Sequence, residues 1–350
     1  MISNEPRLTR FFHPVISAHD LKRKPKSVMI GDEKIVVYRD HENEVVALED
    51  RCPHRFTPLS EGKVKPNGRL ACPYHGWNFN GKGEGLKPAQ SDSEKASCKV
   101  QAYQVVEKYG YLWIGNSEAD PQAIPEYGEP GWDMVGAYSL RFQAPLHISF
   151  DNFSEDEHFP FVHKFFGWDE SGVGDVEFNC ERVGEKIRVH YFGPQRSFFG
   201  MSLLLIRPGL FLNNDWVTSF DPPNIVYTAH LTDKDKNHAS PGTNRLAIYF
   251  VPHGPNETDL HVFQFINFKN PAWTKFLPLL RPSYLWMTKT DIKQDAEFVK
   301  KLKDIPPSLH GMALGKYDKP IVYGRKLLNE IYYGKEAAAP APGERPDLHV

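Results

Sequence analysis

The chain has 350 residues, 40% of them hydrophobic, and its 42 lysines and arginines nearly balance 44 aspartates and glutamates. Such a balance creates no overall field for nucleic acid or an anionic membrane, and no apolar run approaches the ~20 residues of a membrane-spanning helix, so we expect neither partner. Met1–Arg10 lacks the apolar core of a signal peptide, and four scattered cysteines do not suit a secreted disulfide scaffold, so we expect a cytoplasmic protein. The length of the chain favours two domains.

Short strands separated by turn residues open the chain. Residues 28–30, 35–38 and 45–48 are rich in β-branched side chains, and Gly31-Asp32 separates the first two runs. Another strand is expected at 111–115. This pattern is typical of a small all-β domain.

Two short motifs follow, Cys52-x-His54 and Cys72-x-x-His75, with seventeen residues between them. Two thiolates and two imidazoles can hold a tetrahedral zinc ion, or a [2Fe–2S] cluster in which the cysteines bind one iron and the histidines the other, the Rieske arrangement. Each motif supplies one sulfur and one nitrogen, whereas zinc fingers usually group Cys with Cys and His with His. The order therefore favours a Rieske cluster, which accepts and relays electrons. The basic side chains nearby form either a docking face for an acidic electron donor or a solvated surface: Arg51, Arg55, Lys63, Lys65 and Arg69.

The composition changes after the cluster motifs, which divides the chain into four parts. We expect a Rieske domain over 1–120, a Pro- and Gly-rich linker over 121–135, a second domain over 136–335 and a Pro/Ala-rich disordered tail over 336–350. The second domain should form strands at 137–150, 186–192, 201–206, 225–231, 245–251 and 259–268, and helices at 284–303 and 321–333. The order of elements predicts an α+β fold with a broad antiparallel sheet.

The stretch Asp151–His163 is very polar for residues that lead into a hydrophobic core. It carries four acidic side chains, an amide and two imidazoles, His158 and His163. With one carboxylate from elsewhere, the two histidines would form the two-His-one-carboxylate face that holds non-haem Fe(II) with open positions for oxygen. The alternative is a polar helix start whose histidines only satisfy hydrogen bonds in the core.

Asp295 is the candidate carboxylate. It lies at three- and four-residue spacing within an apolar stripe formed by Ile292, Phe298, Val299 and Leu302. A carboxylate on that stripe would be buried and would need a cation or hydrogen bonds. Asp291, one turn earlier, is the competing ligand. The alternative is a surface Asp295 paired with Lys289 or Lys300.

The spacing of the two histidines requires a bend. Five residues correspond to about 140° around an ideal helix, so a straight helix cannot direct His158 and His163 at one ion. Pro160 cannot donate a backbone hydrogen bond, and it predicts a helix break between the histidines.

Taken together, these motifs resemble those of the Rieske non-haem iron oxygenases over residues 8–335, because Asn152-x-x-Glu155-x-x-His158 and His163 follow the two Cys–His motifs. The length and the opening Arg10-Phe-Phe-His-Pro14 look like the single-subunit branch that contains vanillate and dicamba O-demethylases, caffeine N-demethylases and aminopyrrolnitrin oxygenase. In that branch the third iron ligand is an Asp that follows an acidic or amide residue and precedes apolar positions. Gln294-Asp295 followed by Phe298-Val299 matches this pattern, which favours Asp295 over Asp291.

The resemblance implies a helix-grip catalytic domain and a head-to-tail homotrimer in which the cluster of one subunit faces the iron of its neighbour. Glu155 stands where the family places a bridging carboxylate, usually an Asp, and Asp156 is the alternative bridge. Asn152 would support the iron ligands from behind. Electrons would reach the cluster from NAD(P)H through a ferredoxin and/or a flavin-containing reductase, and would leave it through His75 or His54.

The implied activity is that of the oxygenase component of a multicomponent monooxygenase. It would use O₂ to hydroxylate, or to O- or N-demethylate, a small aromatic or heterocyclic molecule. Two other functions stay open. Family members that act on quaternary ammonium compounds also carry Glu at the position of Glu155, which indicates such a compound or an aliphatic amine as substrate. A Rieske electron-transfer protein without oxygenase activity would hold no iron at His158 and His163.

Overall fold

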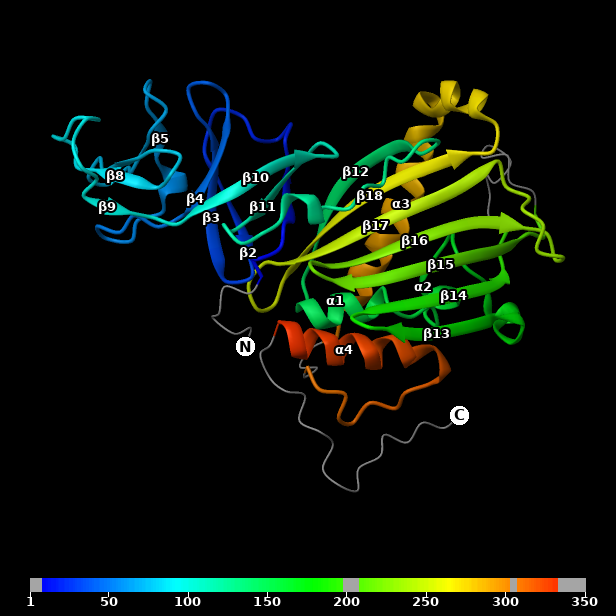
Figure 1. Ribbon diagram of the computed structural model, residues 1–350. Helices are drawn as coiled ribbons and strands as arrows, with labels where there is room; N and C mark the ends of the chain where they lie inside the picture. The colour runs from blue at the N-terminus through cyan, green and yellow to red at the C-terminus, as the bar shows by residue number, and fades with distance from the viewer. Residues whose placement is uncertain (1–7, 198–207, 303–306, 333–350) are drawn as a thin grey trace. The chain divides into compact units, whose positions relative to one another are not determined.

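The computed structural model describes residues 8–197, 208–302 and 307–332, which divide into two compact units (Figure 1). One unit comprises the residues up to Pro125 together with Val251–Pro255, and the other comprises Glu126–Phe250 and the residues from Asn256 onward. The division at Pro125 lies inside the stretch 121–135. The expected strand 201–206 and the expected tail 336–350 lie outside the described residues.

The first unit is an all-β domain of two antiparallel sheets. One sheet has the order β1-β11-β10-β4-β3-β2 and the other β5-β6-β7-β8-β9. The bounds are His13–Ser17 (β1), Lys26–Ile30 (β2), Glu33–Arg39 (β3), Val45–Glu49 (β4), Lys63–Val64 (β5), Leu70–Ala71 (β6), Asn78–Phe79 (β7), Glu84–Leu86 (β8), Cys98–Lys99 (β9), Ala102–Lys108 (β10) and Tyr111–Gly115 (β11). The strands expected at 28–30, 35–38, 45–48 and 111–115 are all present.

The core of this unit contains the cysteines of both motifs. Tyr38, Leu48 and Phe79 are fully buried and pack in one cluster with Cys52 and Cys72. This apolar setting is why the thiols face inward.

Arg69 does not belong to the basic surface that the sequence suggested. Its side chain is only 8% exposed and donates to Asn78 Oδ1 at 2.5 Å and to the Glu84 carbonyl at 2.7 Å. Because these acceptors hold the guanidinium inside the sheet that contains β7 and β8, Arg69 cannot contribute to docking.

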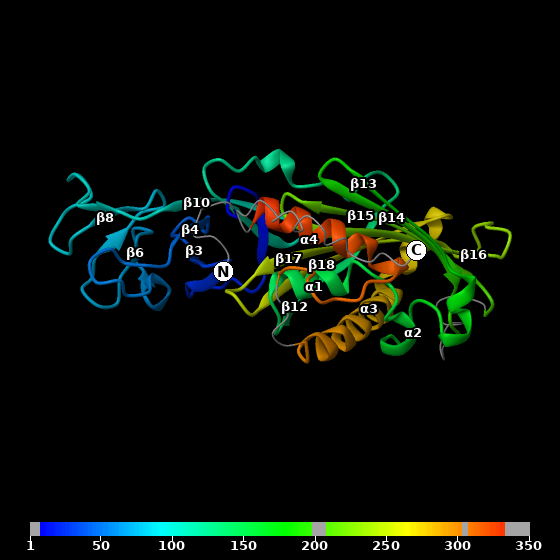
Figure 2. The same cartoon turned by 90° about the horizontal axis from the view of Figure 1, so that it is seen from below.

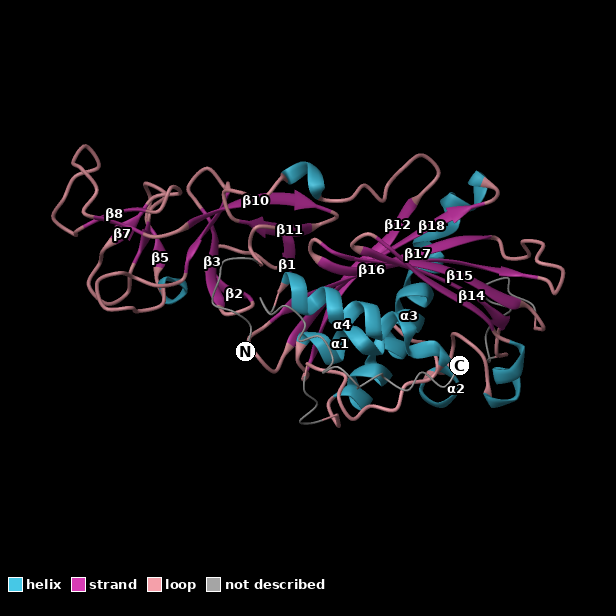
Figure 3. Cartoon of the chain, turned by 60° about the horizontal axis from the view of Figure 1, so that its bottom comes forward, coloured by secondary structure: helices cyan, strands magenta, loops and turns pink. Residues whose placement is uncertain are grey.

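The second unit is built on one antiparallel sheet with the order β12-β18-β17-β16-β15-β14-β13. Figures 2 and 3 show helices α1, α3 and α4 lying along this sheet. The bounds are Asp133–Phe142 (β12), Leu146–Asn152 (α1), Phe159–Val162 (α2), Glu177–Val183 (β13), Lys186–Pro194 (β14), Phe211–Phe220 (β15), Pro223–Thr232 (β16), Gly242–Pro252 (β17), Thr258–Phe268 (β18), Leu277–Val299 (α3) and Lys319–Ile331 (α4). The predicted α+β fold, an all-β domain followed by a large antiparallel sheet with helices, is confirmed.

Two element predictions were wrong in extent. The strand expected at 137–150 ends at Phe142, and Leu146–Asn152 is helix α1, whose residues Leu146–Phe150 are buried throughout and therefore show no alternation. The helix expected at 284–303 begins earlier, at Leu277, and ends at Val299. None of the helices in the described ranges is long and apolar enough to cross a membrane.

The buried face of α3 differs from the apolar stripe expected from the sequence. Phe298 and Leu302 are each 48% exposed. The buried positions instead recur at three- and four-residue spacing along one face, and they include both candidate carboxylates: Tyr284, Met287, Thr288, Asp291, Ile292, Asp295 and Val299. The expectation that Asp295 lies on the buried face is confirmed, although two of the apolar neighbours that suggested it are on the surface.

A buried ion pair joins α1 to α4. Arg325 is 2% exposed and donates from Nε to Asp151 Oδ1 at 2.9 Å and from Nη2 to Asp151 Oδ2 at 2.5 Å. Burial raises the pKa of Asp151 to about 6, and the guanidinium opposes this rise. Removing either partner would leave the other charge buried without a counter-charge. The ion pair therefore holds α1 against α4.

Candidate metal centres

The two Cys–His motifs form paired loops in the first unit. The Phe56 amide donates to the Cys52 carbonyl at 2.7 Å, and the Gly76 amide donates to the Cys72 carbonyl at 3.1 Å, so each loop closes as a tight turn. Gly76 has a φ of 70°, a left-handed conformation that glycine adopts at little cost. Both cysteines are at most 4% exposed, whereas the His54 side chain is exposed. The loops therefore hold the thiols inward and the imidazoles toward solvent.

Each ligand-type side chain lies close to its counterpart in the other loop, Cys52 to Cys72 and His54 to His75. The rings of His54 and His75 have centroids 4.5 Å apart, and Trp77 stacks on His54 at 5.2 Å. Burial and the neighbouring Cys72 raise the pKa of the Cys52 thiol to about 11, against the effect of the backbone amide of His54. A buried thiol of this kind becomes a thiolate only when a metal binds it.

The geometry of the loops argues against a single zinc ion. In a tetrahedral zinc site all four ligand atoms would lie within roughly 4 Å of one another. Within the described residues, however, the one group of three or more potential ligand atoms within 4.8 Å of each other is found elsewhere, in the second unit. A two-iron cluster does not require such closeness, because its sulfur and nitrogen ligands bind different irons.

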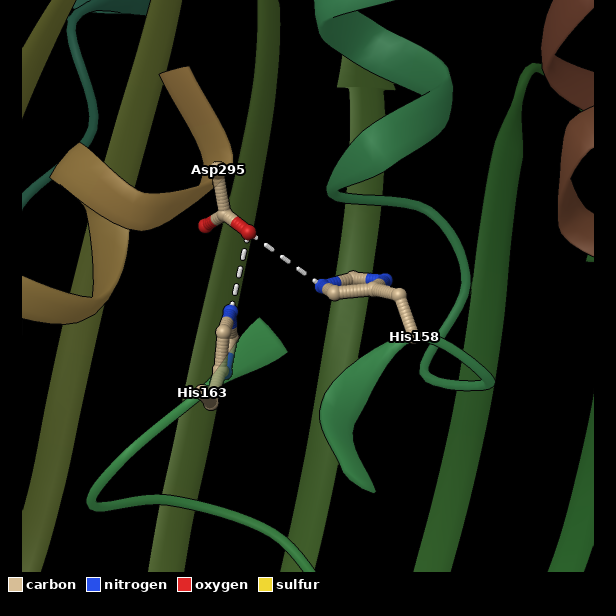
Figure 4. A group of neighbouring side chains, drawn as sticks. All are labelled: His158, His163 and Asp295. Carbon is tan, nitrogen blue, oxygen red and sulfur yellow. Dashed lines mark hydrogen bonds and ion pairs between the residues drawn. The ribbon is translucent and has the colours of Figure 1, made fainter. Parts of the chain in front are cut away.

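That group consists of His158, His163 and Asp295, brought together from two segments of the second unit. His163 Nε2 lies 2.9 Å and His158 Nε2 lies 3.4 Å from Asp295 Oδ1. Figure 4 shows both rings directed at this one carboxylate of α3. Asp295 is 1% exposed, so the structure supplies the buried two-His-one-carboxylate set that the sequence suggested.

The short helix α2 sets the positions of the two histidines, though not in the way expected. Pro160 lies in the first turn of α2, where it needs no hydrogen-bond partner, and does not break a helix. His158 caps the start of α2, and His163 caps its end with an extended backbone at φ −81° and ψ 150°. The prediction of a break at Pro160 was wrong, because the chain leaves the helix only at His163.

Two carboxylates stabilise a positive charge at His158. Burial opposes protonation of this imidazole, but Glu155 and Asp295 outweigh burial and raise its pKa to about 10. His158 and His163 likewise keep the pKa of Asp295 well below its ordinary value, although burial alone would raise it. A divalent cation bound by these side chains would replace the proton as the positive charge that balances Glu155 and Asp295.

Glu155 determines which nitrogen of His158 faces the site. The Nδ1–H group of His158 donates to Glu155 Oε1 at 2.5 Å, which leaves Nε2 as the nitrogen directed at Asp295. His158 Nε2 is buried and has no hydrogen-bond partner within the described part of the chain. An orphaned ring nitrogen next to a buried carboxylate fits a metal ligand, and the Glu155 contact is of the kind that orients ligating histidines.

Asp291 has a different role from Asp295. It accepts hydrogen bonds from the amides of Lys164 at 3.3 Å and Phe166 at 3.1 Å, and it is not part of the three-residue group. Asp291 thus holds the backbone that follows His163. Burial raises its pKa, while His163 lowers it.

Asn152 and Asp156 lie on either side of Glu155. Asn152 lines the adjoining cavity, and its Nδ2 is buried without a partner among the described residues. Asp156 is 1% exposed, and burial, reinforced by Glu155, raises its pKa well above the ordinary value. A carboxyl so deeply buried is less accessible to another subunit than that of Glu155, whose side chain is 15% exposed.

Arg196 is a residue of this site that sequence reasoning missed. Its guanidinium donates to the carbonyls of Phe159 at 3.2 Å and Pro160 at 3.1 Å, and also to those of His163 and Trp168. Together with Asp291 it therefore holds both sides of the loop that carries His163. An arginine just after a strand has no motif, so only the structure could reveal this contact.

A cavity of about 170 Å³ adjoins the three-residue group. Its walls come from the segment after α1, from α3 and from strands β15, β16 and β17, and they are mostly apolar, including Phe153, Phe159, Leu212, Leu246, Ile248 and Met287. An apolar cavity that ends at this buried candidate metal site can hold a small organic molecule and exclude water from it.

Comparison with known proteins identifies the first unit as a Rieske domain and finds demethylases among the relatives. Residues 11–104 match the family model of the Rieske [2Fe-2S] domain. The chain is 37% identical over 152 residues to the oxygenase component of dicamba O-demethylase from Stenotrophomonas maltophilia, covering 41% of this chain and 44% of that protein. It is 31% identical over 208 residues to methylxanthine N1-demethylase from Pseudomonas putida, covering 55% and 59%. The chain thus spans about half the length of the curated relatives it matches.

The likeness of fold extends over both units. A crystal structure of dicamba monooxygenase bound to 3,6-dichlorosalicylic acid matches with a TM-score of 0.77 at 21% identity, covering 95% of this chain and 99% of the other. The matched cluster domain, the demethylase relatives and the shared fold agree with the two Cys–His motifs and the His–His–Asp group. Residues 11–104 therefore form a Rieske [2Fe-2S] domain, and the chain as a whole has the fold of dicamba monooxygenase.

Proposed function

We propose that this chain is the oxygenase component of a multicomponent Rieske monooxygenase that removes a methyl group from oxygen or nitrogen on a small ring compound. The observation that carries this proposal is the buried His158–His163–Asp295 group at the end of an apolar cavity. A cluster domain alone would fit an electron-transfer protein. Such a protein has no need for an enclosed cavity beside a second metal-binding group.

In this proposal Cys52, His54, Cys72 and His75 hold the [2Fe–2S] cluster. His158, His163 and Asp295 would hold Fe(II) beside the cavity. The chemistry that such an iron supplies is the activation of O₂ for transfer of one oxygen atom into a C–H bond. Hydroxylation of an O- or N-methyl group gives a hydroxymethyl product that breaks down to formaldehyde and the demethylated compound.

The protein itself contributes binding, orientation and exclusion of water. The apolar wall, including Phe153 and Leu246, takes up the ring of the substrate and keeps bulk water from the reaction. Glu155 keeps the Nδ1 proton of His158 engaged, so that Nε2 stays available as a ligand. Asn152 adds a polar group at the cavity wall behind the histidines.

Electron supply in this proposal runs between subunits of a head-to-tail homotrimer. A ferredoxin or flavin-containing reductase that draws on NAD(P)H would reduce the cluster, and His54 or His75 and Glu155 of the neighbouring subunit would connect it to the iron site. The exposure of His54 and the partial exposure of Glu155 support this route, because both ends of the contact reach the surface.

The relatives favour a ring compound with an O- or N-methyl group over a quaternary ammonium compound as substrate, since their names specify dicamba, vanillate and methylxanthines. The experiment is to supply the purified chain with a reductase and to measure formaldehyde release and O₂ uptake across methoxy-aromatic and N-methyl heterocyclic compounds. Formaldehyde release that the Asp295→Ala variant abolishes would support the proposal. Reduction of the cluster by the reductase without product from any compound would favour the electron-transfer alternative.

A further inference from the structure

The sheet wall of the cavity carries one polar row between apolar rows. Asn214 of β15 lies opposite Ala229 of β16, and Ala229 lies opposite Asn244 of β17. Side chains in register across neighbouring strands share a face, and all three residues line the cavity. The rows on either side are formed by Leu212 and Leu231, and by Trp216, Tyr227 and Leu246.

Both asparagines have an unmet hydrogen-bonding need. The Oδ1 atoms of Asn214 and Asn244 are buried, and neither has a partner within the described part of the chain. Asn214 is only 5% exposed. Buried amide oxygens almost always find a partner, and leaving one without costs free energy, so a water or a ligand in the cavity would complete this row.

Ala229 leaves space between the two amides. Adjacent strands lie ~4.8 Å apart, so the backbones of Asn214 and Asn244 are separated by about 10 Å, with only a methyl group between them. A flat ring fits such a gap, with its edges toward the two amides and its faces against the apolar rows. A larger side chain than Ala229 would fill the gap.

The amides provide polarity without charge. The acidic side chains that line the cavity already have partners: Glu155 binds His158, Asp291 binds backbone amides, and Asp295 faces the two histidines. His230, also on the wall, has a pKa lowered by burial and remains neutral near pH 7. Outside the His158–His163–Asp295 group, the described wall therefore offers the two unpartnered Oδ1 acceptors and the Asn152 Nδ2 donor, and it offers no cation that would neutralise a carboxylate.

We propose that Asn214 and Asn244 select the substrate, and that it is an uncharged ring compound that carries N–H or O–H donors for their two side-chain oxygens. This inference rests on the proposed demethylase function and adds the class of molecule that the cavity accepts. The two asparagines orient the ring by its donor edge, so that a methyl group elsewhere on the ring meets the iron site.

Three ligands that differ in one substituent test the inference. Guaiacol is uncharged and carries an O–H donor, veratrole replaces the donor by a second methoxy group, and 2-methoxybenzoate replaces it by a carboxylate. Dissociation constants, measured by calorimetry on the iron-loaded protein without O₂, should be lowest for guaiacol. Because guaiacol has a single O–H donor, at least one of Asn214→Leu and Asn244→Leu should weaken its binding about tenfold, equal to about 1.4 kcal/mol, and neither should weaken veratrole.

Asn213 provides the matched control, because it neighbours Asn214 on β15 and does not line the cavity. Asn213→Leu should keep the preference for guaiacol. Thermal unfolding of all three variants separates a loss of selectivity from a loss of folding, since Asn→Leu at an unpartnered amide should not destabilise the protein. Ala229→Leu should weaken all ligands together.

The outcomes that overturn the inference are tighter binding of 2-methoxybenzoate, a preference for guaiacol that survives in both variants, or no binding of any of the three ligands. Selective binding without formaldehyde release under turnover conditions would contradict the proposed demethylation alone. The two proposals can therefore fail separately.

Discussion

Replacing Arg196 by methionine should loosen the loop that carries His163 and weaken iron binding there, without affecting the cluster. The guanidinium donates to four backbone carbonyls in the segment from Phe159 to Trp168. Methionine fills similar space but donates no hydrogen bond. The carbonyls of Pro160 and His163 would then lose this donor, whereas the Phe159 carbonyl keeps the His163 amide.

The expected size follows from the number and kind of these bonds. A hydrogen bond from a charged donor contributes roughly 1.5–3 kcal/mol, but a single Arg196 nitrogen serves three of the carbonyls and the side chain is partly exposed, so the contributions do not add. We take a total of about 2 kcal/mol. Metal binding would then have to supply the free energy that orders His163. Iron affinity should therefore fall roughly 10–100-fold, the range found when residues that orient metal ligands are replaced.

The assay is competition between the protein and a chelator for Co(II) at the mononuclear site under anaerobic conditions, with cluster absorbance as the internal reference. Arg196→Lys keeps the charge but loses the planar set of donors, so its affinity should lie between those of Arg196→Met and the unaltered chain. Arg188→Met, at an exposed position of β14, is the control and should bind metal normally. Normal metal affinity in Arg196→Met would refute the reasoning, and so would parallel loss of the cluster, which indicates general unfolding.

Three further results are expected. Asp295→Asn should lower the iron content from about three to about two atoms per chain with an unchanged cluster spectrum, and a loss of cluster iron would contradict the separation of the two centres. If electrons cross between subunits as proposed, subunits that carry Cys72→Ser and subunits that carry Asp295→Ala should each be inactive and should regain activity when assembled together; absence of recovery would exclude that route. Burial lowers the pKa of His261 to about 4, so the unfolded chain binds an additional proton as the pH falls below 6.5. The contribution of His261 to the free energy of unfolding should therefore decline by up to about 3 kcal/mol between pH 6.5 and 4. Urea titrations over this pH range should show a weaker decline in His261→Gln.

The sequence alone predicted which residues form the two candidate centres. Cys52, His54, Cys72 and His75 lie in short loops, so their spacing along the chain is nearly their arrangement in space. The predicted strands of the first domain were present because their side chains alternate or are β-branched, which is local information. The resemblance to a family gave the fold of the second domain, which the strand pattern could indicate only in outline.

The tertiary structure decided how the second centre is assembled. His163 and Asp295 are separated by 132 positions, and only the packing of α3 against the segment after α1 brings them to 2.9 Å. Sequence periodicity could not separate Asp291 from Asp295, since both lie on the buried face of α3. Their contacts separated them: Asp291 meets backbone amides, whereas Asp295 meets two imidazoles.

Two features had no signal in the sequence. The contacts of Arg196 depend on where the loop after β14 passes α2. The row of Asn214, Ala229 and Asn244 depends on strand register across three strands. Register and loop path are set by the packing of the whole domain, because each is stabilised by contacts between residues far apart in the chain. A sequence pattern reports which side chains are present, and only the folded chain determines which of them meet.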